Sequence, residues 1–160
     1  MSVAHEPPVI ELLPDREQVR AQIEDIYDTY RADGADKAMA KFMAHAGLGE
    51  APGQEAGAPR WEPSPEQLAT MRATTEMFLA HLLRPTTHYR PDVEALLAAP
   101  ARIVVAAGAT SKGQLAHRGA VALADRLGTP VVEFPGDHGG FVTLPKQCGH
   151  VLDQVLTQAT

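Results

Sequence analysis

Residues 91–160 alternate twice between a short β-branched run and a helical pattern, and this alternation limits the folds open to the chain. The runs are Arg102–Ala107 (RIVVAA) and Pro130–Phe134 (PVVEF), and each is followed by a glycine-containing loop and a helical apolar stripe. Such an order is typical of a parallel α/β sheet. Because crossovers are right-handed, we expect both strands to end at one sheet edge, where ligands bind in such folds.

Three helices are expected around these strands. They are a short helix at Val93, Leu96 and Leu97, a second with Leu115, Val121, Leu123 and Leu127 that Gly128 ends, and a last helix over Pro145–Gln158. The last helix is expected to bury Val151, Leu152, Val155 and Leu156. The two intervening segments, Gly108–Gly113 and Pro135–Thr143, are expected to be loops.

Residues 15–90 favour helices and contain no strand candidate. Asp15 and Gln18 form a capping-box signature for a helix that Gly34 ends, and Ala35–His45 predicts a second helix. Ser64 before Pro65 predicts the start of a third. Its expected apolar stripe is Leu68, Met71, Thr75, Phe78, Leu79 and Leu82. Gly47–Pro65 holds four prolines and four glycines, so a flexible loop is expected there.

The charge balance and the apolar pattern exclude several classes of partner. The 160 residues include 14 Lys+Arg and 20 Asp+Glu, with no basic run, which argues against a nucleic-acid or anionic-membrane partner. No apolar stretch approaches the roughly 20 residues of a membrane span. The N-terminus has no signal-peptide pattern, and the lone Cys148 excludes an internal disulfide. We therefore expect a cytoplasmic protein.

Polar residues gather in the loops that leave the two strands, Gly108–Gly113 (GATSKG) and Pro135–Phe141 (PGDHGGF). In the second loop His138 stands between Asp137 and a Gly-Gly pair, which suits an imidazole that projects from a tight turn toward a ligand. The alternative is structural, with His138 capping the final helix or bonding a nearby carbonyl. The strand-end position favours the functional interpretation.

The segments AHEPPVIELLPD, RIVVAAGATSKGQLAHRGAVALADRLG and PVVEFPGDHGGF together resemble the C-terminal half of the α/β-hydrolase fold. The resemblance implies a partial fold of about three parallel strands with flanking helices and a helical cap. It divides the chain into a first core strand and turn (1–11), a cap (12–90) with the flexible 47–65 loop, and an α/β core (91–160). In that family the histidine after the last strand is the general base of a catalytic triad, and His138 matches that position. The candidate binding residues beside it are Gly108, Gly139, Gly140 and Phe141.

The chain departs from that family in its nucleophile. The family carries a serine on a G-x-S-x-G elbow, whereas the serines here are Ser2, Ser64 and Ser111, none of them in that motif. Ser111 is an alternative nucleophile because it follows a strand and precedes a helix, but GATSKG does not fit the elbow and a loop or capping role is favoured. Acyl transfer needs an activated nucleophile and oxyanion donors, so we expect the chain alone to have no turnover.

The triad acid also needs a location. The usual loop, after the seventh strand of the family, offers Ala109, Thr110 and Ser111, none of which is a carboxylate. Some family members take the acid from the turn after the sixth strand, where this sequence has Glu6. The resemblance implies that Glu6 accepts the second ring N–H of His138 and fixes its tautomer. A solvated loop carboxylate is the alternative, and the sequence leaves both open.

The spacing of the seven histidines does not indicate a metal site. None forms H-x-x-x-H or H-E-x-x-H, and Cys148 with His150 makes a weak pair that diverges on a helix. We therefore expect no metal and no cofactor.

Two functions from different classes follow. The first is hydrolysis of an ester, lactone, amide or related bond in a small molecule, once a nucleophile-bearing half completes the fold. The second is a non-catalytic fragment that binds a small molecule or a partner. In both, the strand within residues 1–8 leaves a sheet edge open, so we expect a complementary N-terminal half or a homodimer to cover it.

Overall fold

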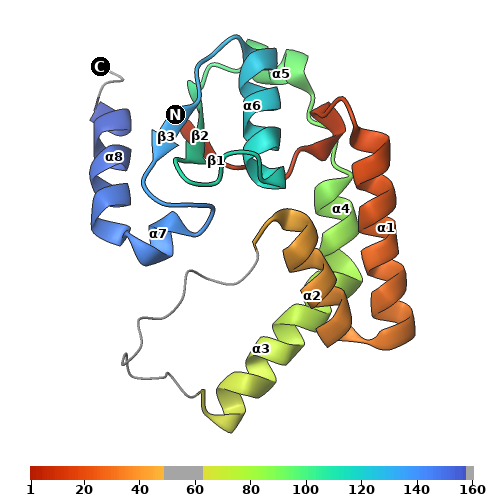
Figure 1. Ribbon diagram of the computed structural model, residues 1–160. Coiled ribbons are helices and arrows are strands. Elements are labelled where there is room, and N and C mark those ends of the chain that lie inside the picture. The colour runs from red at the N-terminus through yellow and green to blue at the C-terminus, as the bar shows by residue number, and fades with distance from the viewer. Residues whose placement is uncertain (49–62, 158–160) are drawn as a thin grey trace. The chain divides into compact units, whose positions relative to one another are not determined.

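The computed structural model describes residues 1–48 and 63–157 (Figure 1). Most of the predicted flexible loop, residues 47–65, lies outside the described residues. The chain divides into two compact units, one made of Met1–Arg16 with Tyr89–Thr160 and the other of Glu17–His88. The candidate site lies entirely in the first unit.

A parallel sheet in the order β1-β2-β3 forms the centre of the first unit. Among the described residues its strands are β1 (Ser2–His5), β2 (Ile103–Gly108) and β3 (Val132–Phe134). His5 pairs with Ala106, and Gly108 pairs with Phe134. Since the strands are parallel, their carboxyl ends meet at one edge. The predicted α/β class, with three parallel strands and flanking helices, is confirmed.

Helices cover both faces of this sheet. They are α5 (Val93–Ala98), α6 (Leu115–Leu127) and α8 (Pro145–Thr157) (Figure 1). Val105 and Ala107 of β2 pack with Leu123 of α6, whereas Ala106, between them in the chain, packs with Cys148 of α8. Successive side chains of a strand point to opposite faces, so β2 is buried on both. This double burial explains why its sequence is continuously apolar.

Two expectations for the C-terminal segment are wrong. Pro135–Thr143 is not all loop, because Gly140–Thr143 forms the short helix α7. Leu152 and Leu156 of α8 are exposed, while Cys148 and Val155 are the residues that this helix buries. A helix covering one narrow face of a small sheet buries only the centre of its apolar stripe, and the flanking leucines therefore stay in solvent.

Helices make up the described part of the second unit and the residues that lead into it. They are α1 (Arg16–Asp33), α2 (Ala35–Ala46), α3 (Pro65–Met77), the π-helical turn η2 (Phe78–Leu82) and α4 (Leu83–Thr87). Ser64 caps α3 in a reciprocal capping box with Gln67, as the sequence indicates. Pro85 has no N–H for a helical bond to the carbonyl of His81, and a π turn just before it absorbs this loss.

The apolar stripe predicted for α3 and η2 is buried only in part. Leu79 is fully buried, as are Ile23 and Ile26 of α1. Leu68, Met71 and Leu82 are exposed, so this apolar stripe is not buried along its whole length. Helical spacing shows which side chains share a face but not what covers that face.

The helices of the described residues do not include a membrane-spanning one. Within residues 1–48 and 63–157, every helix is too short or too polar to span a bilayer.

Candidate functional site

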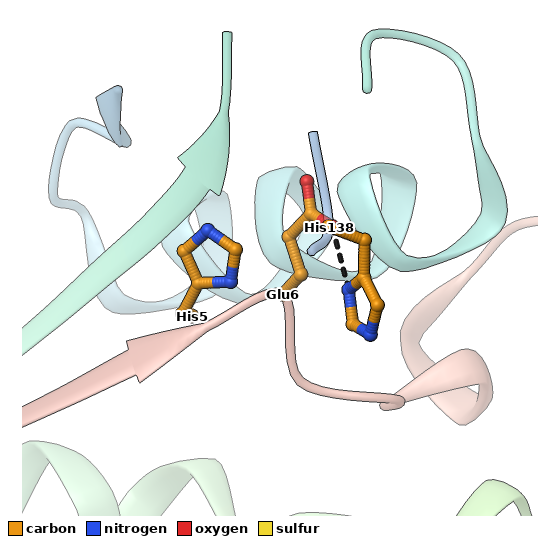
Figure 2. Close-up of side chains that lie close together, drawn as sticks. All are labelled: His5, Glu6 and His138. Atoms are coloured by element: carbon orange, nitrogen blue, oxygen red, sulfur yellow. Dashed lines mark hydrogen bonds and ion pairs between the residues drawn. The ribbon is translucent and has the colours of Figure 1, made fainter. Parts of the chain in front are cut away.

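Three segments that are far apart in the chain meet at the carboxyl edge of the sheet. Glu6 directly follows β1, Gly108 ends β2, and His138 lies in the loop after β3. Glu6 and His138 are 132 residues apart in sequence, yet Nδ1 of His138 lies 2.8 Å from Oε2 of Glu6 (Figure 2). The parallel topology produces this meeting, because it sends all three strand ends to the same side.

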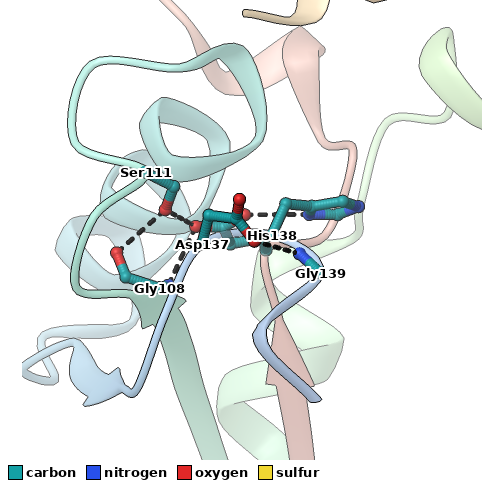
Figure 3. Close-up of polar contacts among 6 residues, drawn as sticks. Gly108, Ser111, Asp137, His138 and Gly139 are labelled. Carbon is teal, nitrogen blue, oxygen red and sulfur yellow. Dashed lines mark hydrogen bonds and ion pairs between the residues drawn. The ribbon is translucent and has the colours of Figure 1, made fainter. Parts of the chain in front are cut away.

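The carboxylate of Glu6 is buried and has partners on both oxygens. Oε1 accepts the backbone N–H of Gly108 at 2.9 Å and also the hydroxyl of Ser111, while Oε2 faces His138 (Figure 3). A buried charge is tolerated only when it is paired and hydrogen-bonded, and these three partners meet that requirement. Glu6 is therefore held as an anion in one orientation.

The backbone of Glu6 adopts a conformation that is unusual for a residue with a side chain. Its φ is +44°, in the left-handed region that disfavours every residue except glycine. In a strand, successive side chains point to opposite faces, and the turn at Glu6 interrupts this alternation. The adjacent side chains of His5 and Glu6 therefore both reach the same edge (Figure 2). Strain of this kind is found mostly at functional sites, where the surrounding structure enforces it.

The loop that carries His138 is packed closely against the end of β2. A Cβ on Gly108 would lie 2.6 Å from the carbonyl carbon of Asp137, and one on Gly140 would lie 2.1 Å from the carbonyl oxygen of Pro135. Within the loop, Oδ1 of Asp137 accepts the N–H of Gly139 at 2.9 Å. These glycines and this turn fix the position of the His138 ring relative to Glu6.

The pair shifts the pKa values of both partners. Burial alone would raise the pKa of Glu6, but the hydrogen bonds from His138, Ser111 and Gly108 outweigh it and lower that pKa. The hydrogen bond to Glu6 raises the pKa of His138 against the opposing effect of desolvation. Burial lowers the pKa of the neighbouring His5, despite the attraction of Glu6. The two imidazoles of this edge are thus shifted in opposite directions.

A titration of the two histidines tests this arrangement. We expect His138 to titrate above 6.5 and His5 below it in NMR spectra, and Glu6→Gln to move the His138 midpoint down. The stabilisation from Glu6 is present above pH 4.5 and lost as pH falls through its lowered pKa. That from His138 is complete below pH 6.5 and lost as pH rises through its raised pKa. A His138 midpoint that Glu6→Gln leaves unchanged would contradict the pairing.

His5 also belongs to this site, although it was not among the residues predicted from the sequence. Its ring lies edge-on to Phe134 at 5.7 Å and to Phe141 at 6.2 Å, and 6.2 Å from the ring of His138. The available signal was its position as the last residue of a strand whose carboxyl end faces the site. One ligand atom each of His5, Glu6 and His138 lie within 4.8 Å of one another, so these three could hold a metal ion.

The other predicted site residues occupy different positions around this pair. Ser111 is fully buried, with its oxygen on Glu6 and 2.8 Å from the carbonyl oxygen of Gly108, which favours its loop role over a nucleophilic one. Gly139 and Gly140 shape the turn behind His138. Phe141 is 60% exposed and lies beside His5. The side chain of His138 is 41% exposed, although its Nδ1 lies against the buried carboxylate of Glu6.

These geometric features define an α/β unit with a buried carboxylate–histidine pair at its strand ends. No protein-family model matches the chain. A protein of Bacillus subtilis (strain 168), described as the uncharacterized hydrolase YraK, is 26% identical over 162 residues. The match covers 96% of this chain and 53% of the relative, so the chain spans about half the length of that protein. The name of this distant relative agrees with the predicted hydrolase class.

Proposed function

We propose that this chain is the acid- and histidine-bearing part of an α/β-hydrolase-type serine hydrolase, acting on an ester, lactone, amide or related bond in a small molecule. The observation that carries the proposal is the 2.8 Å contact between Nδ1 of His138 and the buried carboxylate of Glu6. A carboxylate in this position selects the imidazole tautomer with its proton on Nδ1. Nε2 is then an acceptor, which is the form a general base needs.

Acylation and deacylation each use two proton transfers at that nitrogen. Nε2 of His138 takes the proton of a serine hydroxyl as the oxygen attacks the carbonyl carbon, and then delivers it to the leaving group. Glu6 stabilises the imidazolium formed in between, because its charge is buried and fixed by Gly108 and Ser111. Water then attacks the acyl carbon while Nε2 of His138 takes its proton, and the imidazolium returns that proton to the serine oxygen as the acid product leaves.

Two further observations support a nucleophile outside these 160 residues. The relative has about twice the length of the chain, which leaves room for another half. In the described part of the sheet, β1 is an edge strand that pairs with β2 alone. A further strand beside β1 would place its carboxyl end next to Glu6, and a serine there would be within reach of His138.

The proposal is tested on a protein in which the chain is preceded by the translation of its upstream coding sequence. We expect a G-x-S-x-G motif in that extension, hydrolysis of p-nitrophenyl esters, and labelling of the elbow serine by a fluorophosphonate. An extended protein that folds but neither hydrolyses esters, lactones or amides nor reacts with the probe would overturn the proposal.

The 160-residue chain alone supplies a second prediction. Ser111 is buried and its oxygen faces Glu6, so we expect no fluorophosphonate adduct on it and no steady esterase turnover. Mass spectrometry of the treated chain measures this. An adduct on Ser111 that His138→Ala abolishes would instead make Ser111 the nucleophile and give the single chain a complete triad.

A further inference from the structure

We propose that His5, Glu6 and His138 form a binding site for a divalent transition-metal ion of the zinc type, and that the bound ion inhibits the hydrolase. The three side chains bring two imidazoles and one carboxylate together, with one ligand atom of each within 4.8 Å of the others (Figure 2). Zinc is held by such nitrogen and oxygen donors, and three protein ligands leave a fourth position for water. The proposal of metal binding is independent of the proposed function, whereas the proposal of inhibition rests on it.

The separation of two of the ligand atoms already suits one ion. Nδ1 of His138 and Oε2 of Glu6 are 2.8 Å apart, and ligand atoms on a tetrahedral zinc ion with bonds of about 2.1 Å are roughly 3.4 Å apart. A small opening of this pair admits the ion. His5 has to approach by rotation of its ring, and its partly exposed position at the end of β1 allows this movement.

The surroundings of the carboxylate also match those of a metal ligand. Metal-bound carboxylates are usually oriented by hydrogen bonds to the other oxygen. Oε1 of Glu6 accepts from Gly108 and Ser111, so the orienting contacts are present while Oε2 remains available to the ion. The aromatic rings of Phe134 and Phe141 lie edge-on to His5, at 5.7 and 6.2 Å between ring centroids.

Inhibition follows from the atoms that the ion would use. Nδ1 of His138 binds the ion only without its proton. In the neutral ring that proton moves to Nε2, and in the imidazolium it leaves to solvent while Nε2 keeps its own proton. A proton on Nε2 removes the acceptor that the serine needs, and Glu6 no longer stabilises an imidazolium because it binds the ion. The same pair therefore serves either as a base or as a metal site, but not as both at once.

The test uses the untagged 160-residue chain, titrated with ZnCl₂ by calorimetry and with CoCl₂ by visible absorption. We expect one Zn²⁺ per chain and the strong visible bands of tetrahedral Co²⁺. His5→Phe keeps a ring against Phe134 and Phe141 but removes the nitrogens, and should weaken Zn²⁺ binding at least about tenfold and abolish those bands. His150→Ala, at an exposed histidine of α8, is the matched control and should change neither result.

Circular dichroism of each variant verifies that it folds. Ser111→Ala provides a second measurement: we expect it to bind Zn²⁺ about tenfold more weakly, because an orienting contact to Glu6 is lost. A folded chain that shows no saturable Zn²⁺ binding, or a His5→Phe variant that binds as well as the unmodified chain, would overturn the metal site. The extended enzyme separates the two proposals. Metal binding without esterase activity would refute only the hydrolase, and esterase activity that is insensitive to Zn²⁺ would refute only the inhibition.

Discussion

His138→Ala in the extended protein is expected to lower kcat by about 10⁴-fold or more. In the proposed mechanism Nε2 of His138 accepts the serine proton, and alanine has no group that can take its place. KM should change little, because the ring contributes to proton transfer more than to substrate binding. Initial rates with a p-nitrophenyl ester at saturating substrate measure the effect.

Glu6→Gln tests the other member of the same pair. The amide cannot stabilise the imidazolium, so kcat should fall by about 10⁴-fold, and the remaining activity should depend on a His138 pKa that is lower than in the unmodified enzyme. His150→Ala, on the exposed side of α8, should leave kcat unchanged. Loss of less than tenfold for His138→Ala would contradict its role as base.

Gly108→Ala is expected to destabilise the chain by about 3 kcal/mol, a value at the upper end for overpacking. The new methyl group would lie 2.6 Å from the backbone carbonyl carbon of Asp137, and neither backbone segment can move without loss of sheet or site contacts. For a chain of this length the loss corresponds to a fall in Tm of roughly 6–12 °C. Urea unfolding followed by circular dichroism gives the free energy directly.

A matched glycine provides the control for this substitution. Gly149 lies within α8 with nothing near the position of its missing Cβ, so Gly149→Ala should be neutral or stabilise by up to about 1 kcal/mol. Gly108→Ala should also move the Asp137–His138 segment away from Glu6, which would return the His138 titration midpoint toward 6.5. Equal stabilities for the two variants would show that the close approach at Gly108 is not required.

The regular elements were predictable because their signals are local. The β-branched runs became β2 and β3, Ser64 begins α3, and Gly128 ends α6 in a left-handed conformation. Each of these depends on a few neighbouring residues and on their intrinsic backbone preferences. The resemblance added Glu6 and His138 as a pair, and the structure places them in contact, while their catalytic roles remain part of the proposal.

What the sequence by itself determined is therefore the order of the strands and of most helices, several of their ends, and the sheet edge that carries the candidate site. Tertiary structure alone decided three further features of that edge: the left-handed turn at Glu6, the contact of Ser111 with that carboxylate, and the addition of His5. It also left Leu68 and Leu152 exposed. The reason is that periodicity is a property of neighbours in the chain, whereas contacts across more than a hundred residues depend on how the strands and helices pack.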